Sequence, residues 1–234
     1  MQHSIRIDLE ISLASKWHTG SGEGGLLIDR LIRRDTRNRP FVPGSTLKGV
    51  VRESCEKLSR TLVFPEPGDP HQTDLTIQDT FYPLQKLGSP VDRIFGNRYQ
   101  SGNLFFRDAC LQGQPPYGYL RDQSRVSTYR MLGTAREHHL FSSEYAGPMK
   151  LKTLIEGYHD NLVFFEKSDP PFSYCLLIAG IMSLERLGGD KSTGCGRIQI
   201  NFDSIEYNGR PFEKELVFDY LDSDLYRMAL KETA

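Results

Sequence analysis

The sequence predicts an α+β fold with a ferredoxin-like or RRM-like core. Residues 4–13 and 196–207 each alternate apolar and polar side chains, which is typical of half-buried strands. Residues 45–60 and 172–187 instead place apolar side chains at helical spacing. With further strands expected between the two helices, the order is strand, helix, strands, helix, strand. That is the order of a split β-α-β unit.

The first strand leads into a glycine-rich loop and then a helix. The loop reads H-T-G-S-G-E-G-G (18–25), and residues 26–42 are expected to form a loop or short hairpin that ends in a strand. That strand leads into Pro43. Ser45 or Thr46 is expected to cap the N-terminus of the helix, because hydroxyl side chains accept bonds from unpaired helix amides.

The middle of the chain predicts an insertion, a short strand and a protruding hairpin. Residues 63–92 are rich in Pro, Asp, Gln and Thr, which indicates an insertion or a long loop. Residues 94–112 predict a turn followed by a strand. Residues 113–148 carry little core pattern but many hydroxyls, arginines and aromatics, so we expect a thumb-like hairpin at about 121–142.

The last part of the core is expected to hold two strands and the second helix. Residues 149–166 predict two strands around His159 and Asp160. The second helix is expected to end at Gly188-Gly189, the residue type that terminates helices.

Length and cysteine usage predict one cytoplasmic domain, residues 1–234. The chain has 234 residues, 38% of them hydrophobic, which suffices for a substantial core. Its four cysteines form no C-x-x-C pair, and the N-terminus lacks the apolar segment of a signal peptide. The longest apolar run, Tyr174 to Leu184, is too short to cross a bilayer, so no membrane partner is expected.

Charge is distributed unevenly along the chain. The net charge of -1 and the pI near 6.6 argue against a free-standing nucleic-acid binder, which is usually basic. Residues 29–52 hold seven Lys or Arg and two acids, whereas residues 203–224 hold seven acids and two cations. The basic segment suits a nucleic acid and the acidic one a protein neighbour, and both also suit ordinary solvated surfaces.

Residues 43–52, P-G-S-T-L-K-G-V-V-R, have the composition of a phosphate-binding helix start. Helix N-terminal amides attract anions. Ser45 and Thr46 add hydroxyls, while Lys48 and Arg52 lie four residues apart on one helix face. A capped helix with a surface cation pair is the alternative interpretation.

Residues 188–197, G-G-D-K-S-T-G-C-G-R, form a second segment of this kind. Four glycines permit a close approach of the backbone to a ligand. Lys191, Ser192 and Arg197 supply candidate phosphate contacts. The alternative is a flexible connection between a helix and a strand.

Two acids stand out in the arginine-rich segment 28–39, Asp29 and Asp35. A lone carboxylate, with a reference pKa of about 3.9, is a weak general base. It is nevertheless a suitable ligand for a hydrated divalent cation near a phosphate. Spacing alone favours neither acid, and an exposed surface aspartate is the commoner case.

Residues 125–141, R-V-S-T-Y-R-M-L-G-T-A-R-E-H-H-L-F, interleave cations with aromatic and apolar side chains. Such a surface suits gripping single-stranded bases. The candidate contacts are Arg125, Tyr129, Arg130, Met131 and Arg136. The adjacent His138 and His139 are candidates for metal-free acid-base cleavage of RNA, or an exposed pair in a loop.

Together these segments resemble the RAMP superfamily, and in particular its backbone subunits in type III CRISPR effector complexes. The resemblance covers about residues 5–205. It rests on the glycine loop and on five segments that follow in the family's order: 43–52, I-F-G-N (94–97), F-R-D-A (106–109), L-G-T-A-R-E-H-H-L-F (132–141) and 188–197.

The resemblance implies a cytoplasmic ribonucleoprotein subunit of antiviral defence that binds a guide RNA and cleaves complementary target RNA. Asp29, fourteen positions before Pro43, corresponds to the family's catalytic aspartate and would also hold a divalent cation, Mg²⁺ or Mn²⁺. The hairpin would wedge into the guide–target duplex. The implied partners are both RNAs, copies or paralogues of the chain, and a large polymerase-like subunit.

Two other functions in the same superfamily stay open on the sequence. One is a non-catalytic scaffold in which Asp29 faces solvent. The other is a metal-independent, guide-processing endoribonuclease that uses His138 or His139 as acid-base groups.

Overall fold

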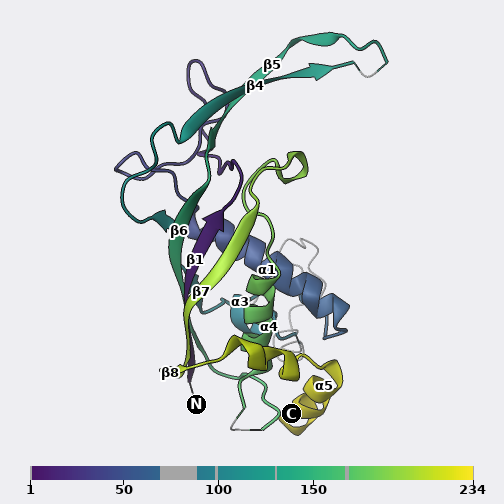
Figure 1. The fold of residues 1–234 in the computed structure, drawn as a ribbon. Coiled ribbons are helices and arrows are strands. Elements are labelled where there is room, and N and C mark those ends of the chain that lie inside the picture. Colours follow the sequence, from purple (N-terminus) through teal and green to yellow (C-terminus); the bar gives the residue numbers. More distant parts are fainter. Residues whose placement is uncertain (1, 69–88, 98–99, 130, 167–168, 234) are drawn as a thin grey trace.

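The fold is built on one antiparallel sheet that runs through the middle of the molecule (Figure 1). The computed structural model describes residues 2–68, 89–97, 100–129, 131–166 and 169–233. The strand order is β2 (Leu104–Phe106), β6 (Met149–His159), β1 (His3–Leu13), β7 (Ile198–Tyr207) and β8 (Arg210–Pro211), and β3 (Cys110–Leu111) also pairs with β6. The predicted α+β class is confirmed.

The central strand β1 supplies the middle of the core. Its alternate side chains Ile5, Ile7, Leu9, Ile11 and Leu13 are all at most 3% exposed. Each buried aliphatic side chain of this size contributes roughly 1.5–3 kcal/mol to folding. The predicted alternation of residues 4–13 is therefore confirmed.

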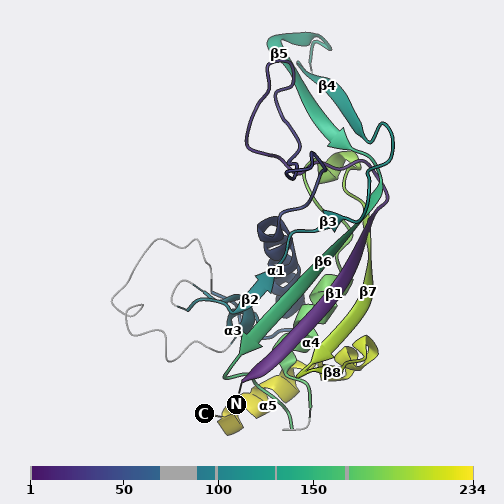
Figure 2. The ribbon, with the colours of Figure 1, turned by 90° about the vertical axis from the view of Figure 1, so that its left-hand side faces the viewer.

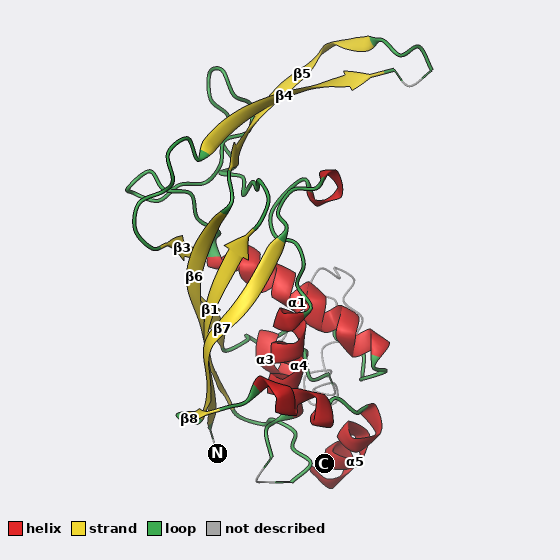
Figure 3. Cartoon of the chain, in the orientation of Figure 1, coloured by secondary structure: helices red, strands yellow, loops and turns green. Residues whose placement is uncertain are grey.

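Helices α1 (Gly44–Thr61) and α4 (Phe172–Met182) pack on one face of the sheet (Figure 3). Residues 172–181 of α4 are all buried, so α4 lies inside the molecule rather than on its surface. The two helices meet at Gly180, where the Ser54 hydroxyl donates to the Gly180 carbonyl at 2.9 Å.

The predicted cap of α1 is wrong. The helix begins at Gly44, so Ser45 and Thr46 lie in its first turn and make no side-chain cap bond. A carboxylate from another segment takes that place, because the Gly44 amide donates to Asp108 Oδ1 at 2.7 Å. Such long-range capping carries no local sequence signal.

The predicted C-terminal end of the second helix is also wrong, since α4 ends at Met182 and not at Gly188. Residues 183–187 run beside the start of β7 instead. The Leu187 amide donates to the Gly196 carbonyl at 2.8 Å, and the Ile198 amide donates to the Glu185 carbonyl at 2.9 Å. Pairing with the returning chain replaces the last helical turns.

The prediction of two strands within 149–166 is correct only for the first, β6. After it, Asn161 adopts a φ of 56° and turns the chain. Leu162 and Val163 are buried without strand pairing. Similarly, residues 26–42 form a loop with isolated bridges rather than a full strand before Pro43.

A long hairpin of β4 (Leu120–Thr128) and β5 (Ala135–Ala146) extends from the end of the sheet (Figures 1 and 2). It occupies the region predicted as a thumb-like hairpin at 121–142. Among its described residues only the base, residues 143–146, is buried, and the rest of the hairpin is exposed or half-buried.

The C-terminal segment folds back at the other end of the molecule (Figure 2). It consists of the 3-10 helix η3 (Lys214–Tyr220) and α5 (Ser223–Thr233), which the sequence did not predict. Tyr226 packs edge-on against Phe64 and Phe172, and Val217 is fully buried. The acidic segment is thus anchored to the core.

Part of the predicted insertion at 63–92 lies outside the described residues, which resume before the short helix α3 (Asp92–Phe95). Among the described residues, no helix has the length and apolar character needed to cross a membrane.

The helix contact at Gly180 predicts a stability difference between two glycine substitutions. In Gly180→Ala the new methyl would overlap Cys55 Sγ, whereas in Gly49→Ala it would meet open space. We expect Gly180→Ala to destabilise the chain by about 1–3 kcal/mol, because overpacking forces a shift. Gly49→Ala should stabilise it by about 0.5–1 kcal/mol.

Urea unfolding of both variants measures this difference. Equal stability of the two variants would contradict the close crossing of α1 and α4.

Candidate functional site

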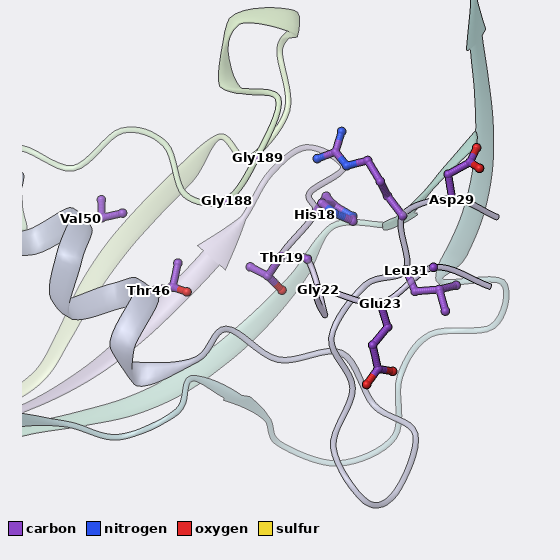
Figure 4. A pocket seen from close by; sticks show the side chains of 13 residues that line it. His18, Thr19, Gly22, Glu23, Asp29, Leu31, Thr46, Val50, Gly188 and Gly189 are labelled. Atoms are coloured by element: carbon purple, nitrogen blue, oxygen red, sulfur yellow. The ribbon is translucent and has the colours of Figure 1, made fainter. Parts of the chain in front are cut away.

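A pocket of about 410 Å³ lies where the base of the hairpin meets the end of the sheet. Its lining comes from four segments that are far apart in sequence: the glycine loop 18–24, residues 29–31, the start of α1 and Gly188-Gly189. Figure 4 shows Asp29 on one side, Thr46 and Val50 of α1 on the other, and His18 and Thr19 between them. The structure therefore brings together parts of the glycine loop and of the segments 28–39, 43–52 and 188–197, whereas the described residues of 125–141 do not line this pocket.

Gly188 makes the close meeting of two of these segments possible. Its φ is +91°, and a Cβ there would lie 2.5 Å from the His18 carbonyl oxygen. The Gly189 amide donates to that same oxygen at 2.8 Å. A side chain at 188 would separate the 188–197 loop from the glycine loop.

Asp29 is exposed and is held by one residue of the hairpin. Its Oδ2 accepts the Ser142 amide at 2.6 Å and the Ser142 hydroxyl at 3.1 Å. The hydrogen bond from the Ser142 amide, and to a lesser extent that from the Ser142 hydroxyl, hold the pKa of Asp29 below its ordinary value. Both donors favour the charged carboxylate. Asp29 is therefore ionised near neutral pH.

Asp35 is occupied by its own loop. Its Oδ1 accepts the Arg37 and Arg39 amides at 2.9 and 2.8 Å, and its Oδ2 accepts Arg39 Nε at 2.8 Å. These bonds close a turn, and Asp35 does not line the pocket. The geometry thus favours Asp29 over Asp35 as the candidate site residue, a choice that sequence spacing did not allow.

Asp190 links three segments at the edge of the pocket, a role the sequence did not reveal. Its carboxylate accepts the Tyr145 hydroxyl at 2.5 Å and lies 3.6 Å from both Arg30 and Arg125. The Tyr145 bond and the two guanidinium groups lower the pKa of Asp190, whereas burial and Asp190 raise the pKa of Tyr145 to about 12. Arg125, predicted to bind RNA, is engaged here within the protein.

Glu144 fixes the neighbouring loop to β5. Its buried carboxylate pairs with Arg34 and accepts the Ile32 amide at 3.2 Å. Its carbonyl accepts His18 Nδ1–H at 2.7 Å. No local pattern distinguished Glu144 in the sequence, because its partners come from other segments.

The two cations of the 43–52 segment, Lys48 and Arg52, are held by protein acceptors. Lys48 Nζ donates to the Leu104 carbonyl at 3.1 Å. Arg52 pairs with Glu56 at 2.8 Å and donates to the Gly96 carbonyl at 3.0 Å. Burial and the nearby Arg52 lower the pKa of Lys48.

The hydroxyls of the same motif remain accessible. Ser45 is exposed, and Thr46 lines the pocket. RNA contact by Lys48 and Arg52 stays a prediction. In this structure both side chains bind acceptors of the protein itself.

The 188–197 loop presents its polar residues outward. Ser192 and Arg197 are exposed, and Lys191 opens the short 3-10 helix η2 (Lys191–Thr193). Lys191 also lines a second groove of about 400 Å³ beside α1, together with Lys57 and Arg186. Glu53 and Glu185 line the same groove, and Lys57 pairs with Glu53 at 2.5 Å, so the groove carries mixed charge.

The hairpin tip carries apolar and aromatic side chains in solvent. Met131 is 99% exposed, and the Arg136 guanidinium lies 4.7 Å from the centre of the Tyr129 ring. Arg130 lies outside the described residues. His138 and His139 are exposed on β5 and do not line the pocket.

Comparison with known proteins identifies the family. The RAMP superfamily matches residues 10–199, which is most of the chain. This chain belongs to the RAMP superfamily.

Individual relatives are distant in sequence. The chain is 24% identical over 210 residues to the "CRISPR system Cms endoribonuclease Csm3" of Streptococcus thermophilus, covering 83% of this chain and 86% of that protein. Among solved structures, it is similar to a chain of the type III-B Cmr-beta complex in its apo state, with a TM-score of 0.57 and 13% identity over 85% and 97% of the two chains. It is also similar to a chain of the type III-B Cmr-beta complex bound to cognate target RNA, with a TM-score of 0.57 and 12% sequence identity. That match covers 84% of this chain and 96% of the other.

On the open face of the RAMP sheet, the central strand β1 offers no aromatic side chains for base stacking, and the exposed aromatics Tyr158 and Phe105 lie on the neighbouring strands β6 and β2. Outward positions of β1 from Ser4 to Ser12 hold only polar and charged side chains. Charges there pair across strands, with Lys150 to Glu10 and Lys152 to Asp203 both at 2.7 Å. Single-stranded RNA bound by RRM sheets stacks on aromatic rings, which this central strand lacks.

The residues of the RAMP pocket fit a divalent cation only in part. Within the described part of the chain, no group of three or more His, Cys, Asp or Glu side chains is arranged to hold a metal ion. Mg²⁺ often takes one or two carboxylates and completes its shell with water and substrate phosphates. Asp29 suits that kind of site, in which RNA supplies most of the ligands.

The bonds from Ser142 predict the titration of Asp29. In Ser142→Ala the hydroxyl donor is lost and the amide donor is kept, so the pKa of Asp29 should rise part of the way to its ordinary value. The carboxyl ¹³C chemical shift of Asp29, followed against pH in both proteins, measures this change. An unchanged pKa would show that the hydroxyl does not act on the carboxylate.

Proposed function

We propose that the chain is a backbone subunit of a type III CRISPR effector complex, which binds guide RNA and cleaves complementary target RNA. The observation that carries the proposal is the pocket where Asp29, the start of α1 and the Gly188-Gly189 loop meet. The names of the relatives support it, since one is an endoribonuclease and one solved complex contains target RNA.

The guide RNA would be held by its backbone. The first turn of α1 presents the hydroxyls of Ser45 and Thr46, which are suited to phosphate oxygens. In the 188–197 loop Ser192 adds a further hydroxyl, and Lys191 and Arg197 add charge. Base pairing between guide and target would supply sequence specificity, so the protein need recognise only backbone and shape. Several copies or paralogues along one guide would give the affinity that a chain of net charge -1 lacks.

The hairpin would act on the guide–target duplex. Its tip presents Tyr129 and Met131, which are suited to unstacking a base pair. A nucleotide splayed in this way can bring its 2′-oxygen in line with the phosphorus and the leaving 5′-oxygen. Such alignment supplies a large part of the barrier reduction in phosphoryl transfer.

Asp29 would act at the phosphate next to the splayed nucleotide. The 2′-oxygen attacks phosphorus, the bond to the 5′-oxygen breaks, and the proton of the 2′-hydroxyl is lost as the 5′-oxygen gains one. The products are a 2′,3′-cyclic phosphate and a 5′-hydroxyl. Asp29, ionised and fixed through Oδ2, would orient the attacking hydroxyl or a hydrated cation.

Mg²⁺ or Mn²⁺, when bound with the RNA, would supply Lewis acid stabilisation of the charge that develops on the phosphate. The remaining partners of the proposal are the other effector subunits, including a large polymerase-like subunit.

Substitution of Asp29 tests the proposal. In a reconstituted complex with guide and labelled complementary RNA, Asp29→Asn should reduce cleavage by about a hundredfold or more while assembly persists, because the carboxylate charge is lost. Asp160→Asn, an exposed acid at the far end of β6, is the matched control and should cleave like wild type. Chelation of divalent cations should have an effect as large as Asp29→Asn.

Undiminished cleavage by Asp29→Asn would contradict the catalytic assignment and leave the chain a guide-binding scaffold. Cleavage that persists in chelator would contradict the role of the cation.

A further inference from the structure

The loop that carries Asp29 is attached along its length to strand β5 of the hairpin. The Arg30 amide donates to the Ser142 carbonyl at 3.2 Å, and the Glu144 amide donates to the Arg30 carbonyl at 3.0 Å. The Leu27 carbonyl oxygen lies 3.1 Å from the Ser142 hydroxyl and shares its single proton with Asp29 Oδ2. The proposed catalytic loop is thus joined to the hairpin base by these bonds and by an isolated bridge between Arg30 and Ser143.

Ser142 is the centre of this attachment. It gives two donors to Asp29 Oδ2, its amide at 2.6 Å and its hydroxyl at 3.1 Å, and its hydroxyl oxygen accepts the Asp29 amide at 3.2 Å. Two donors on one oxygen fix the rotation of the carboxylate. Both bonds from Ser142 end on Oδ2, which leaves Oδ1 to face a ligand.

Ser142 in turn belongs to the strand-paired base of the hairpin. It pairs with Ser124 across the β4–β5 ladder, and the buried residues 143–146 follow it on β5. Movement of the hairpin base therefore moves Ser142, and movement of Ser142 moves Asp29.

We propose that Ser142 is a positioning residue that fixes the Asp29 carboxylate to the hairpin, so that the acid is aligned by the element that contacts the RNA duplex. This inference rests on the proposed cleavage activity and names the part of the site that orients it. Ser142 touches neither RNA nor cation in this scheme and acts only through Asp29.

The neighbouring residue offers a matched control. Ser143 is fully buried, and its hydroxyl has no hydrogen-bond partner among the described residues. Ser143→Ala removes the same atom one position along the strand without touching Asp29. Ser142→Thr keeps the hydroxyl and suits a strand, because β-branched residues favour extended backbone.

The experiment compares wild type with Ser142→Ala, Ser142→Thr, Ser143→Ala and Asp29→Asn in the reconstituted complex. Single-turnover cleavage at saturating target RNA gives the rate, and binding of the same target to each complex gives the affinity. A positioning role predicts that Ser142→Ala slows cleavage about tenfold or more, since small misplacements of a reacting group cost up to about a hundredfold. Its affinity for target should stay within about twofold of wild type.

Ser142→Thr should restore at least a third of the wild-type rate, and Ser143→Ala should match wild type. A general structural role would lower affinity or assembly together with rate, and threonine would then bring no selective rescue.

The outcomes separate the two proposals. If Asp29→Asn abolishes cleavage but Ser142→Ala cleaves at the wild-type rate, the role of Ser142 is overturned and the proposed function stands. If Ser143→Ala is as slow as Ser142→Ala, the effect is structural and the inference is overturned. If Asp29→Asn itself cleaves normally, the proposed function fails, and the role of Ser142 fails with it.

Discussion

The carboxylate of Asp190 holds together three parts of the chain that form the site. It accepts the Tyr145 hydroxyl of the hairpin at 2.5 Å and lies 3.6 Å from Arg30 of the Asp29 loop and from Arg125. Asp190 itself adopts a left-handed φ of 57°, directly after the two glycines that contact His18. Because its pKa is lowered, these contacts are present above the ordinary pKa of an aspartate and are lost only as pH falls through the depressed value.

Ion pairs within the protein account for much of the positive charge of the basic segment 29–52. In the sequence it is a strongly cationic stretch, yet Arg30, Arg34 and Arg39 pair with Asp190, Glu144 and Asp35. The arginines mostly shape the loop and neutralise buried or half-buried acids. Under the proposed function, contact with RNA would depend on small hydroxyl side chains and a few exposed cations, which agrees with a net charge near zero.

The fold was predictable where the signal was local. Alternation identified β1 and β7, and helical spacing identified α1 and α4, because one face of each strand and of α1 must be buried. The ends of these elements depended on distant partners: Asp108 caps α1, and pairing with 196–198 ends α4 early. No single-sequence pattern reports such contacts.

The sequence identified the segments that line the pocket, but not the side-chain contacts that join those segments to one another. The glycines of 188–197 and the hydroxyls of 45–46 were predicted to belong to one site, and Gly188, Gly189 and Thr46 do line one pocket, while phosphate binding there stays a prediction. The choice between Asp29 and Asp35 required geometry, as did the roles of Ser142, Glu144 and Asp190, since each acts on a residue from another part of the chain.

The most direct test of this site is photo-crosslinking of RNA in the assembled complex. Target RNA that carries 4-thiouridine at the nucleotide beside the cut would be irradiated, and the crosslinked peptides mapped by mass spectrometry. A site at the pocket predicts crosslinks within residues 18–31, 45–50 and 188–197. Crosslinks confined to the charged open face of the sheet, around Arg6, Lys150 and Lys152, would contradict it.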